Sequence, residues 1–166
     1  MGANLDLIRA TYEGASEDNG RNLLAALAPD ARWTEAEGFP YAGTYVGAEA
    51  IIAGVFRRLA TEWIGYRADV HTYLEDGDRV AAFGVYSGTY KATGKSMHAA
   101  FAHLYEVRGG KIARMTQYVD TFLVQQALTR TLEVAAPTTA KFETSGSDLA
   151  QAIAPDPSGG NLAAPV

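Results

Sequence analysis

The sequence predicts a single α+β domain in which helices cover one face of a curved antiparallel sheet. In residues 4–63 apolar side chains recur mostly at helical spacing, whereas residues 66–120 alternate with a period of two. Tight-turn sequences at 76–78, 93–95 and 109–110 divide the second region into an antiparallel meander. Helices and strands that are segregated along the chain are typical of the α+β class. A curved sheet wrapped around the N-terminal helices leaves a cone-shaped pocket, which suits a small molecule.

Three helices are predicted in the first part of the chain. The first begins near Asn4, a good N-cap residue, and the turn-forming residues 18–20 are expected to end it. A short second helix ends before Pro29, because proline cannot continue a helix interior. A third helix runs from about Ala48 to Trp63, with one apolar side and one charged side.

The rest of the chain is predicted to form four long strands, a last helix and a tail. The strands cover residues 66–75, 80–90, 96–107 and 111–120, and the helix covers 122–132. Residues 134–166 are rich in Ala, Pro, Thr, Ser and Gly, so we expect a disordered or loosely attached tail outside a domain of residues 1–133.

Composition excludes several classes of function. The 166 residues suit one domain, and the absence of cysteine excludes disulfides and thiolate metal sites. A net charge of −5 with scattered Lys and Arg argues against nucleic-acid binding. No apolar run reaches the roughly 20 residues of a membrane helix, and the N-terminus lacks a signal-peptide pattern, so a cytoplasmic location is expected. The three histidines lack metal-ligand spacing, and we expect neither a metal nor a cofactor.

Glu35 is the leading candidate for a catalytic residue. It ends a short predicted strand, residues 31–35, which precedes a loop that includes residues 43–47. Because side chains alternate along a strand, Trp33 and Glu35 share one face, and Arg32 on the opposite face favours an inward position for this pair. Apolar surroundings are expected to raise the pKa of Glu35 toward neutrality, where a general base is most useful. The structural alternative is a carboxylate that accepts hydrogen bonds from backbone amides.

His103 is predicted to face the pocket from the third long strand. It shares an apolar face with Phe101 and Tyr105, whereas His71 and His98 lie on polar faces, which indicates surface positions. An inward histidine can donate a hydrogen bond to a developing enolate oxygen or relay a proton. The alternative is a core histidine that is hydrogen-bonded to a tyrosine.

The last strand carries candidates on both faces. Gln117 and Met115 share one face, which is expected to line the pocket. Asp120 shares the other face with Arg114, which favours an outward position for Asp120 unless a β-bulge shifts the alternation. Asp120 is an acid–base candidate, and N-capping of the last helix is the competing explanation.

Four stretches of the chain carry a family resemblance. They are LAPDARWTE at 27–35, YAGTYVG at 41–47, FAHLYEVRGGKI at 101–112 and QYVD at 117–120. Between residues 4 and 130 the chain resembles the nuclear transport factor 2-like superfamily, and within it the SnoaL-like and ketosteroid-isomerase-like proteins. The resemblance implies the curved-sheet fold and a homodimer, whose close contact could use the small residues at 81–82 and 99–100. It specifies activity weakly, because the superfamily includes isomerases, cyclases, epoxide hydrolases, dehydratases and proteins with no known catalysis.

The resemblance also implies roles for individual residues. The isomerases carry a carboxylate base on the first strand, where this chain has Glu35. Their oxyanion hole pairs a tyrosine on the first helix, within one residue of Tyr12, with an acidic residue whose position is taken here by His103. SnoaL-like cyclases carry an acid–base aspartate on the last strand, near Asp120 and Gln117.

Together these observations favour a small cofactor-independent enzyme that transfers a proton next to a carbonyl of an apolar or ring-containing molecule, as in isomerisation, cyclisation or dehydration. Glu35 would take the proton, while Tyr12 and His103 would stabilise the oxyanion. The residues expected to contact the substrate are Trp33, Phe101, Tyr105, Met115 and Gln117. The alternative is a module of the same fold that binds a hydrophobic ligand unchanged or mediates dimerisation. A third hypothesis, epoxide hydrolysis by Glu35 and Asp120, would need an inward arginine.

Overall fold

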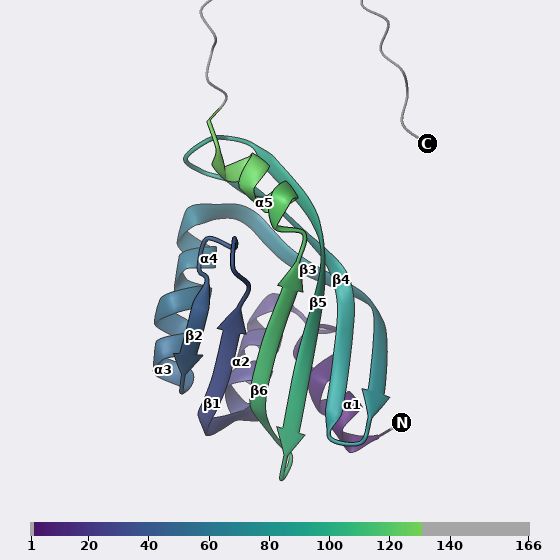
Figure 1. Cartoon of the computed structure of the whole chain (residues 1–166). Helices are drawn as coiled ribbons and strands as arrows, with labels where there is room; N and C mark the ends of the chain where they lie inside the picture. Colours follow the sequence, from purple (N-terminus) through teal and green to yellow (C-terminus); the bar gives the residue numbers. More distant parts are fainter. Residues whose placement is uncertain (1, 131–166) are drawn as a thin grey trace, which may run out of the picture. The chain divides into compact units, whose positions relative to one another are not determined.

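A curved, unclosed sheet of six strands organises the fold (Figure 1). A computed structural model describes residues 2–130 of the chain. The strands are β1 (Leu27–Glu35), β2 (Gly43–Val46), β3 (Trp63–Asp76), β4 (Arg79–Tyr90), β5 (Ser96–Arg108) and β6 (Lys111–Val119). The helices are α1 (Ala3–Arg9), α2 (Ser16–Ala26), α3 (Ala48–Ile51), the π-helical segment η1 (Ile52–Phe56), α4 (Arg57–Glu62) and α5 (Thr121–Leu128).

The strand order is β2-β1-β6-β5-β4-β3, and the predicted meander from β3 to β6 is confirmed. Neighbouring strands of this sheet are antiparallel except β1 and β6, which run parallel. A parallel pair needs a long connection, and here everything from β2 to β5 lies between the two strands in sequence. Figure 1 shows α1 and α2 behind the sheet and α3–α4 beside β2, so the α+β class is confirmed.

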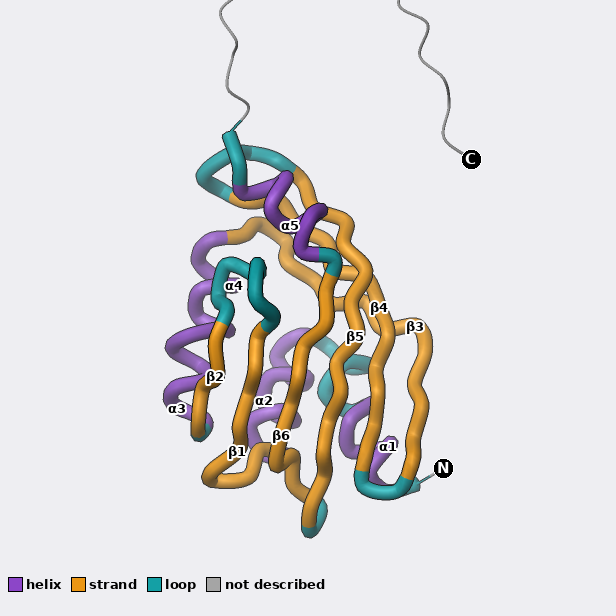
Figure 2. The backbone as a smooth tube through the Cα atoms, viewed as in Figure 1, coloured by secondary structure: helices purple, strands orange, loops and turns teal. Residues whose placement is uncertain are grey.

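The sheet bends where β3 and β4 pair irregularly, and Figure 2 shows β3 to β5 curving over at one end. The pairing shifts between Val70 and Thr72, where β3 holds an extra residue. Opposite this bulge, Gly84 of β4 lets the two backbones approach, since a Cβ there would lie 2.4 Å from the carbonyl oxygen of Asp69. The bulge and the glycine together supply the curvature that opens the pocket.

The same bulge corrects the predicted faces of β3. Strict alternation places Leu74 on the face of Val70 and places Tyr73 opposite. In the structure Tyr73 packs against the core and Leu74 is 61% exposed. One extra residue reverses the faces of everything that follows it, which period-two counting does not detect.

The boundary between the first two helices differs from the prediction. Residues 18–20, expected to end the first helix, lie within α2, and the chain breaks instead at residues 10–15. Asn19 explains the shift, because its side chain bonds the backbone oxygens of Tyr12 and Gly14 and the nitrogen of Gly14. Its amide therefore closes the connecting loop from inside α2, in a role that turn propensity does not reveal.

The strand borders also differ from the prediction at two places. Strand β1 begins at Leu27 and contains Pro29, although its pairing with β6 is irregular between Leu27 and Arg32. Residues 43–47, expected to form a loop, contribute β2, which pairs with β1 as the outermost strand. An edge strand needs only one partner, so its sequence pattern is weak.

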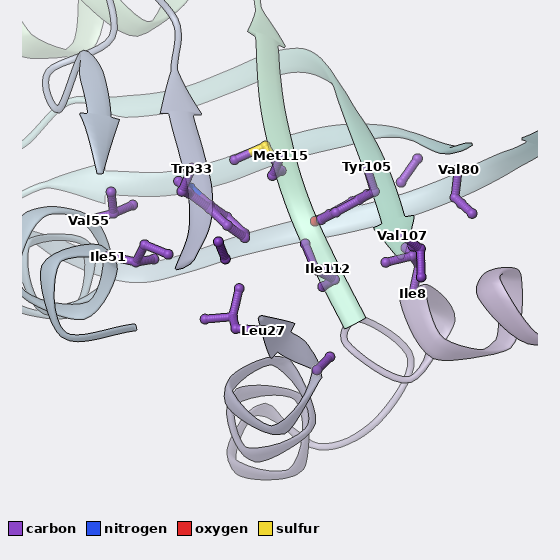
Figure 3. Close-up of a cluster of buried hydrophobic side chains, with 13 residues drawn as sticks. Ile8, Leu27, Trp33, Ile51, Val55, Val80, Tyr105, Val107, Ile112 and Met115 are labelled. Atoms are coloured by element: carbon purple, nitrogen blue, oxygen red, sulfur yellow. The ribbon is translucent and has the colours of Figure 1, made fainter. Parts of the chain in front are cut away.

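The core lies between the sheet and the helices (Figure 3). Trp33, Tyr105 and Met115 lie in register across β1, β6 and β5 and pack with Ile8 of α1 and Val55 of η1. Of the small residues expected at a dimer contact, Ala82 and Ala99 are buried in this core, while Ala81 and Ala100 face outward. The homodimer stays a prediction.

The last helix, predicted to span residues 122–132, is α5 and ends at Leu128. The predicted tail, residues 134–166, lies outside the described residues, as does the end of the predicted 1–133 domain.

The π-helical segment offers a test of the packing between η1 and β2. A Cβ on Gly54 would lie 2.1 Å from the Tyr45 ring, so Gly54→Ala should lower the free energy of unfolding by about 1–3 kcal/mol, the usual range for overpacking. Gly20 of α2 has no atom within 4 Å of that position, so Gly20→Ala should raise stability by about 0.5–1 kcal/mol. Urea unfolding of both variants measures the two signs, and an equal gain in both would contradict the packing at Tyr45.

Candidate active site

A pocket of about 930 Å³ opens between the α1–α2 connection, the η1–α4 helix and the inner face of the sheet. Aromatic rings form most of its walls: Trp33, Phe39, Phe56, Trp63 and Tyr66. Six polar side chains reach it from the strands and from the end of the first helical region: Tyr12, Glu35, Tyr86, His103, Tyr105 and Gln117. The site is therefore apolar with a few convergent polar groups, as small-molecule sites are.

Glu35 is held inside the pocket by the alternation of β1. Its side chain is 4% exposed, and one carboxylate oxygen accepts a hydrogen bond of 2.7 Å from the indole Nε1 of Trp33, two residues earlier on the same face. The second oxygen, Oε2, is buried without a hydrogen-bond partner among residues 2–130. The expected inward position of Glu35 is confirmed, and backbone amides do not bind its carboxylate within the described chain.

Burial raises the pKa of Glu35 from 4.5 to about 7, because the charged form loses water, and the Trp33 indole offsets part of the rise. A carboxyl group with this pKa is partly ionised at neutral pH, as a general base requires. The free Oε2 atom is the atom that a ligand proton can approach.

His103 lies between two tyrosines. Its Nδ1 atom is 2.5 Å from the Tyr12 hydroxyl, and its Nε2 atom is hydrogen-bonded to the Tyr86 hydroxyl. The Tyr12 hydroxyl also bonds that of Tyr105. Complete burial lowers the pKa of His103 to about 3, so the ring is neutral at physiological pH. Both ring nitrogens are occupied by tyrosines, so His103 acts on a ligand through Tyr12.

Gln117 joins the network from β6, where it is paired with His103 of β5. Its Nε2 donates to the Tyr86 hydroxyl at 3.0 Å, and its Oε1 accepts from the backbone N–H of Ala36 at 3.0 Å. Burial raises the pKa of Tyr12, Tyr86 and Tyr105, so all three phenols keep their protons.

The structure brings together most of the residues that the sequence analysis selected. Glu35, Tyr12 and His103 line one pocket with three of the predicted contact residues, Trp33, Tyr105 and Gln117. The other two predicted contact residues lie behind the wall. Phe101 stacks on Tyr86 with ring centroids 4.1 Å apart, and Met115 is fully buried in the core.

Asp120 lies apart from these residues. Its side chain is exposed, and its Oδ1 accepts a hydrogen bond of 3.2 Å from the backbone N–H of Leu123. It is the N-cap of α5 and does not line the pocket, which corrects its selection as an acid–base residue. The alternation on β6 continues without a bulge up to Val119, so the outward face implied by Arg114 holds.

Tyr86 is the main site residue that the sequence analysis missed. It follows Val80, Ala82 and Gly84 on the inner face of β4, and these small residues leave room for its ring above the sheet. That run of small inward residues before a tyrosine is a signal in the sequence. Phe39, Trp63 and Tyr66 were treated only as general aromatic surface, because loop and bulge geometry decides their direction.

Within residues 2–130, no group of three or more His, Asp or Glu side chains could hold a metal ion. The helices of that range are all too short or too polar to cross a membrane.

Comparison with known proteins identifies the family. The model of the SnoaL-like domain matches residues 8–115, which include Tyr12, Glu35, Tyr86, His103 and Tyr105. The chain belongs to the SnoaL-like family. No curated protein matches it.

Solved structures of the same fold resemble this SnoaL-like domain. An NTF2-like protein from Burkholderia thailandensis is 40% identical, with a TM-score of 0.73 over 78% of this chain and 99% of that chain. An NTF2-like protein of unknown function from Burkholderia pseudomallei is 28% identical, with a TM-score of 0.70 over 78% and 99% of the two chains. TerC, crystallised with polyporic acid, is 28% identical, with a TM-score of 0.68 over 76% and 98%.

The raised pKa of Glu35 predicts a pH-dependent effect of its replacement. The unfolded chain loses the proton near pH 4.5 and the folded chain near pH 7, so stability falls between these values, by about 3 kcal/mol in full. Gln imitates the neutral acid, so Glu35→Gln should be more stable than wild type by about 3 kcal/mol at pH 8 and little changed at pH 4.

Urea unfolding at the two pH values measures this difference. The lowered pKa of His103 has the opposite sign, since stability is lost as pH falls from 6.5 toward 3. That loss occurs in both proteins and cancels in the comparison. Equal stability of wild type and variant at pH 8 would show that Glu35 is not desolvated.

The position of Asp120 predicts a purely structural effect. Asp120→Ala removes the N-cap of α5 and should lower the free energy of unfolding by about 1 kcal/mol. The stability difference assigned to Glu35 between pH 4 and pH 8 should remain, which repeating the urea series on this variant would measure. A loss of that difference would place Asp120 in contact with the site after all.

Proposed function

We propose that this chain is a cofactor-independent enzyme that transfers a proton next to a carbonyl group of an apolar, ring-containing small molecule. The observation that carries the proposal is the free Oε2 of Glu35, a buried base atom that faces a pocket and has no hydrogen-bond partner within the described residues. A carboxylate kept only for structure would have its acceptors satisfied, because an unpaired buried acceptor costs about 1–3 kcal/mol.

The chemistry begins with Glu35 in its ionised form. Its Oε2 takes a proton from the carbon next to the carbonyl, and the electron pair of that C–H bond moves to the carbonyl oxygen and forms an enolate. The Tyr12 hydroxyl, supported by His103 and Tyr105, donates a hydrogen bond to this oxygen. Return of the proton from Glu35 to a different carbon completes an isomerisation, whereas attack of the enolate carbon on a second carbonyl completes a cyclisation.

The walls of the pocket support this chemistry in two ways. Aromatic side chains such as Trp33 and Phe56, whose ring centroids are 5.4 Å apart, offer flat apolar contact for a ring compound. They also exclude water, which keeps the Glu35 pKa near 7 and strengthens the hydrogen bond to the enolate oxygen. TerC was crystallised with polyporic acid, which supports an organic ligand for this pocket.

Exchange of carbon-bound protons tests the proposal without knowledge of the natural substrate. Wild-type protein in D₂O should exchange the α-protons of bicyclic ketones such as indanone and tetralone faster than buffer does, which proton NMR measures. Glu35→Gln should lose this activity by at least about 100-fold, because the amide cannot accept the proton. Thr116→Val, on the outer face of β6, is the matched control and should exchange at the wild-type rate.

The outcome separates catalysis from simple binding. Exchange that survives Glu35→Gln contradicts the proposed base. Binding of polyporic acid or a bicyclic ketone without any exchange in the wild type contradicts catalysis and favours the alternative, a module that holds a hydrophobic ligand unchanged.

A further inference from the structure

Five polar side chains at the base of the pocket form one continuous chain of hydrogen bonds. It runs from Gln117 to Tyr86, His103, Tyr12 and Tyr105. Neutral histidine has one N–H donor and one acceptor nitrogen, and each phenol donates one proton. The direction of donation at one end therefore decides the direction along the whole chain.

The backbone determines the orientation of the Gln117 amide. The N–H of Ala36 can only donate, and it lies 3.0 Å from Oε1 of Gln117. A flipped amide would set its NH₂ group against this N–H, so two donors would face each other. The observed orientation leaves Nε2 of Gln117 as the donor to the Tyr86 hydroxyl, at 3.0 Å.

The Tyr86 oxygen accepts this hydrogen bond, so its own proton is available for the next group. That group is Nε2 of His103. If Nε2 carried the ring proton, two N–H groups would donate to the Tyr86 oxygen, and the phenol proton would lose its acceptor. The arrangement that satisfies all three groups has Tyr86 donating to an unprotonated Nε2, which places the single ring proton on Nδ1.

We propose that Gln117, acting through Tyr86, holds neutral His103 in the Nδ1–H tautomer and so leaves the Tyr12 hydroxyl proton free to point at a ligand. Nδ1–H donates to the Tyr12 oxygen across 2.5 Å, so the Tyr12 proton is directed to Tyr105 or into the pocket. In the opposite tautomer Tyr12 would donate to His103 and would have no proton for an enolate oxygen. Gln117 is thus a positioning residue, and this consequence for catalysis rests on the proposed function, whereas the tautomer does not.

The chain also links the donor to the base through one short segment of backbone. Ala36, whose N–H orients Gln117, directly follows Glu35 at the end of β1. The end of this strand therefore places the proton acceptor and sets the direction of the donors on the far side of the pocket.

Nitrogen NMR of protein labelled with ¹⁵N-histidine tests the proposal without any substrate. Long-range proton–nitrogen correlation spectra distinguish the Nδ1–H and Nε2–H tautomers of a neutral ring. The exposed His98 serves as an internal reference for a ring in solvent, and His103→Gln assigns the buried signal by its loss. Wild-type His103 should appear as Nδ1–H at neutral pH, and a wild-type Nε2–H signal would overturn the proposal without recourse to any variant.

Gln117→Met tests the part played by the amide. Met keeps the length of the side chain but donates nothing to Tyr86, so the Tyr86 oxygen becomes free to accept from Nε2–H, and the tautomer ratio should shift by at least about tenfold. Gln126→Met makes the same substitution at an exposed position of α5, outside the pocket, and should leave the ratio unchanged. A folded Gln117→Met protein with the wild-type ratio would contradict the role of Gln117.

The exchange assay then separates this inference from the proposed function. Gln117→Met should slow α-proton exchange by about tenfold while leaving the pH midpoint set by Glu35 unchanged, since only the donor side is altered. An Nδ1–H signal without exchange in the wild type would support the tautomer and contradict catalysis. Exchange with an Nε2–H signal would support catalysis and contradict the inference.

Discussion

The removal of the Glu35 carboxylate from water is the constraint on which the rest of the site depends. The strand places the side chain beneath aromatic walls, and only the Trp33 indole compensates part of the lost hydration. A single neutral donor is enough to orient the group and too little to stabilise its charge fully. The acid therefore stays close to the point at which it gains or loses a proton, and the fold carries the cost.

The donor side of the pocket solves the opposite problem. His103 is fully buried and stays neutral, and its two tyrosine partners satisfy both ring nitrogens. The stacking of Phe101 on Tyr86 and the pairing of Gln117 with His103 hold these groups on rigid strands. A base with an unsatisfied oxygen thus faces a set of donors whose hydrogen bonds are satisfied, which is a pre-organised arrangement for charge that moves from one side to the other.

Local chemistry in the sequence was sufficient to predict the meander, the buried faces and the best single candidates. Period-two alternation placed Glu35 and His103 inward, because a strand presents every second side chain to the same side. The same counting identified Gln117 as a pocket residue and gave the outward face of Asp120. Family resemblance added Tyr12, whose helical spacing alone is equally compatible with packing.

Tertiary structure decided everything that depends on pairs of distant residues. The meeting of Tyr86 with His103 and Gln117, the parallel pairing of β1 with β6 and the bulge that turns Tyr73 inward all follow from register between strands, which has no local signature. The free oxygen of Glu35 is likewise a property of its surroundings. Sequence by itself determines which side chains are available on each face, and only packing determines which of them meet and which are left without a partner.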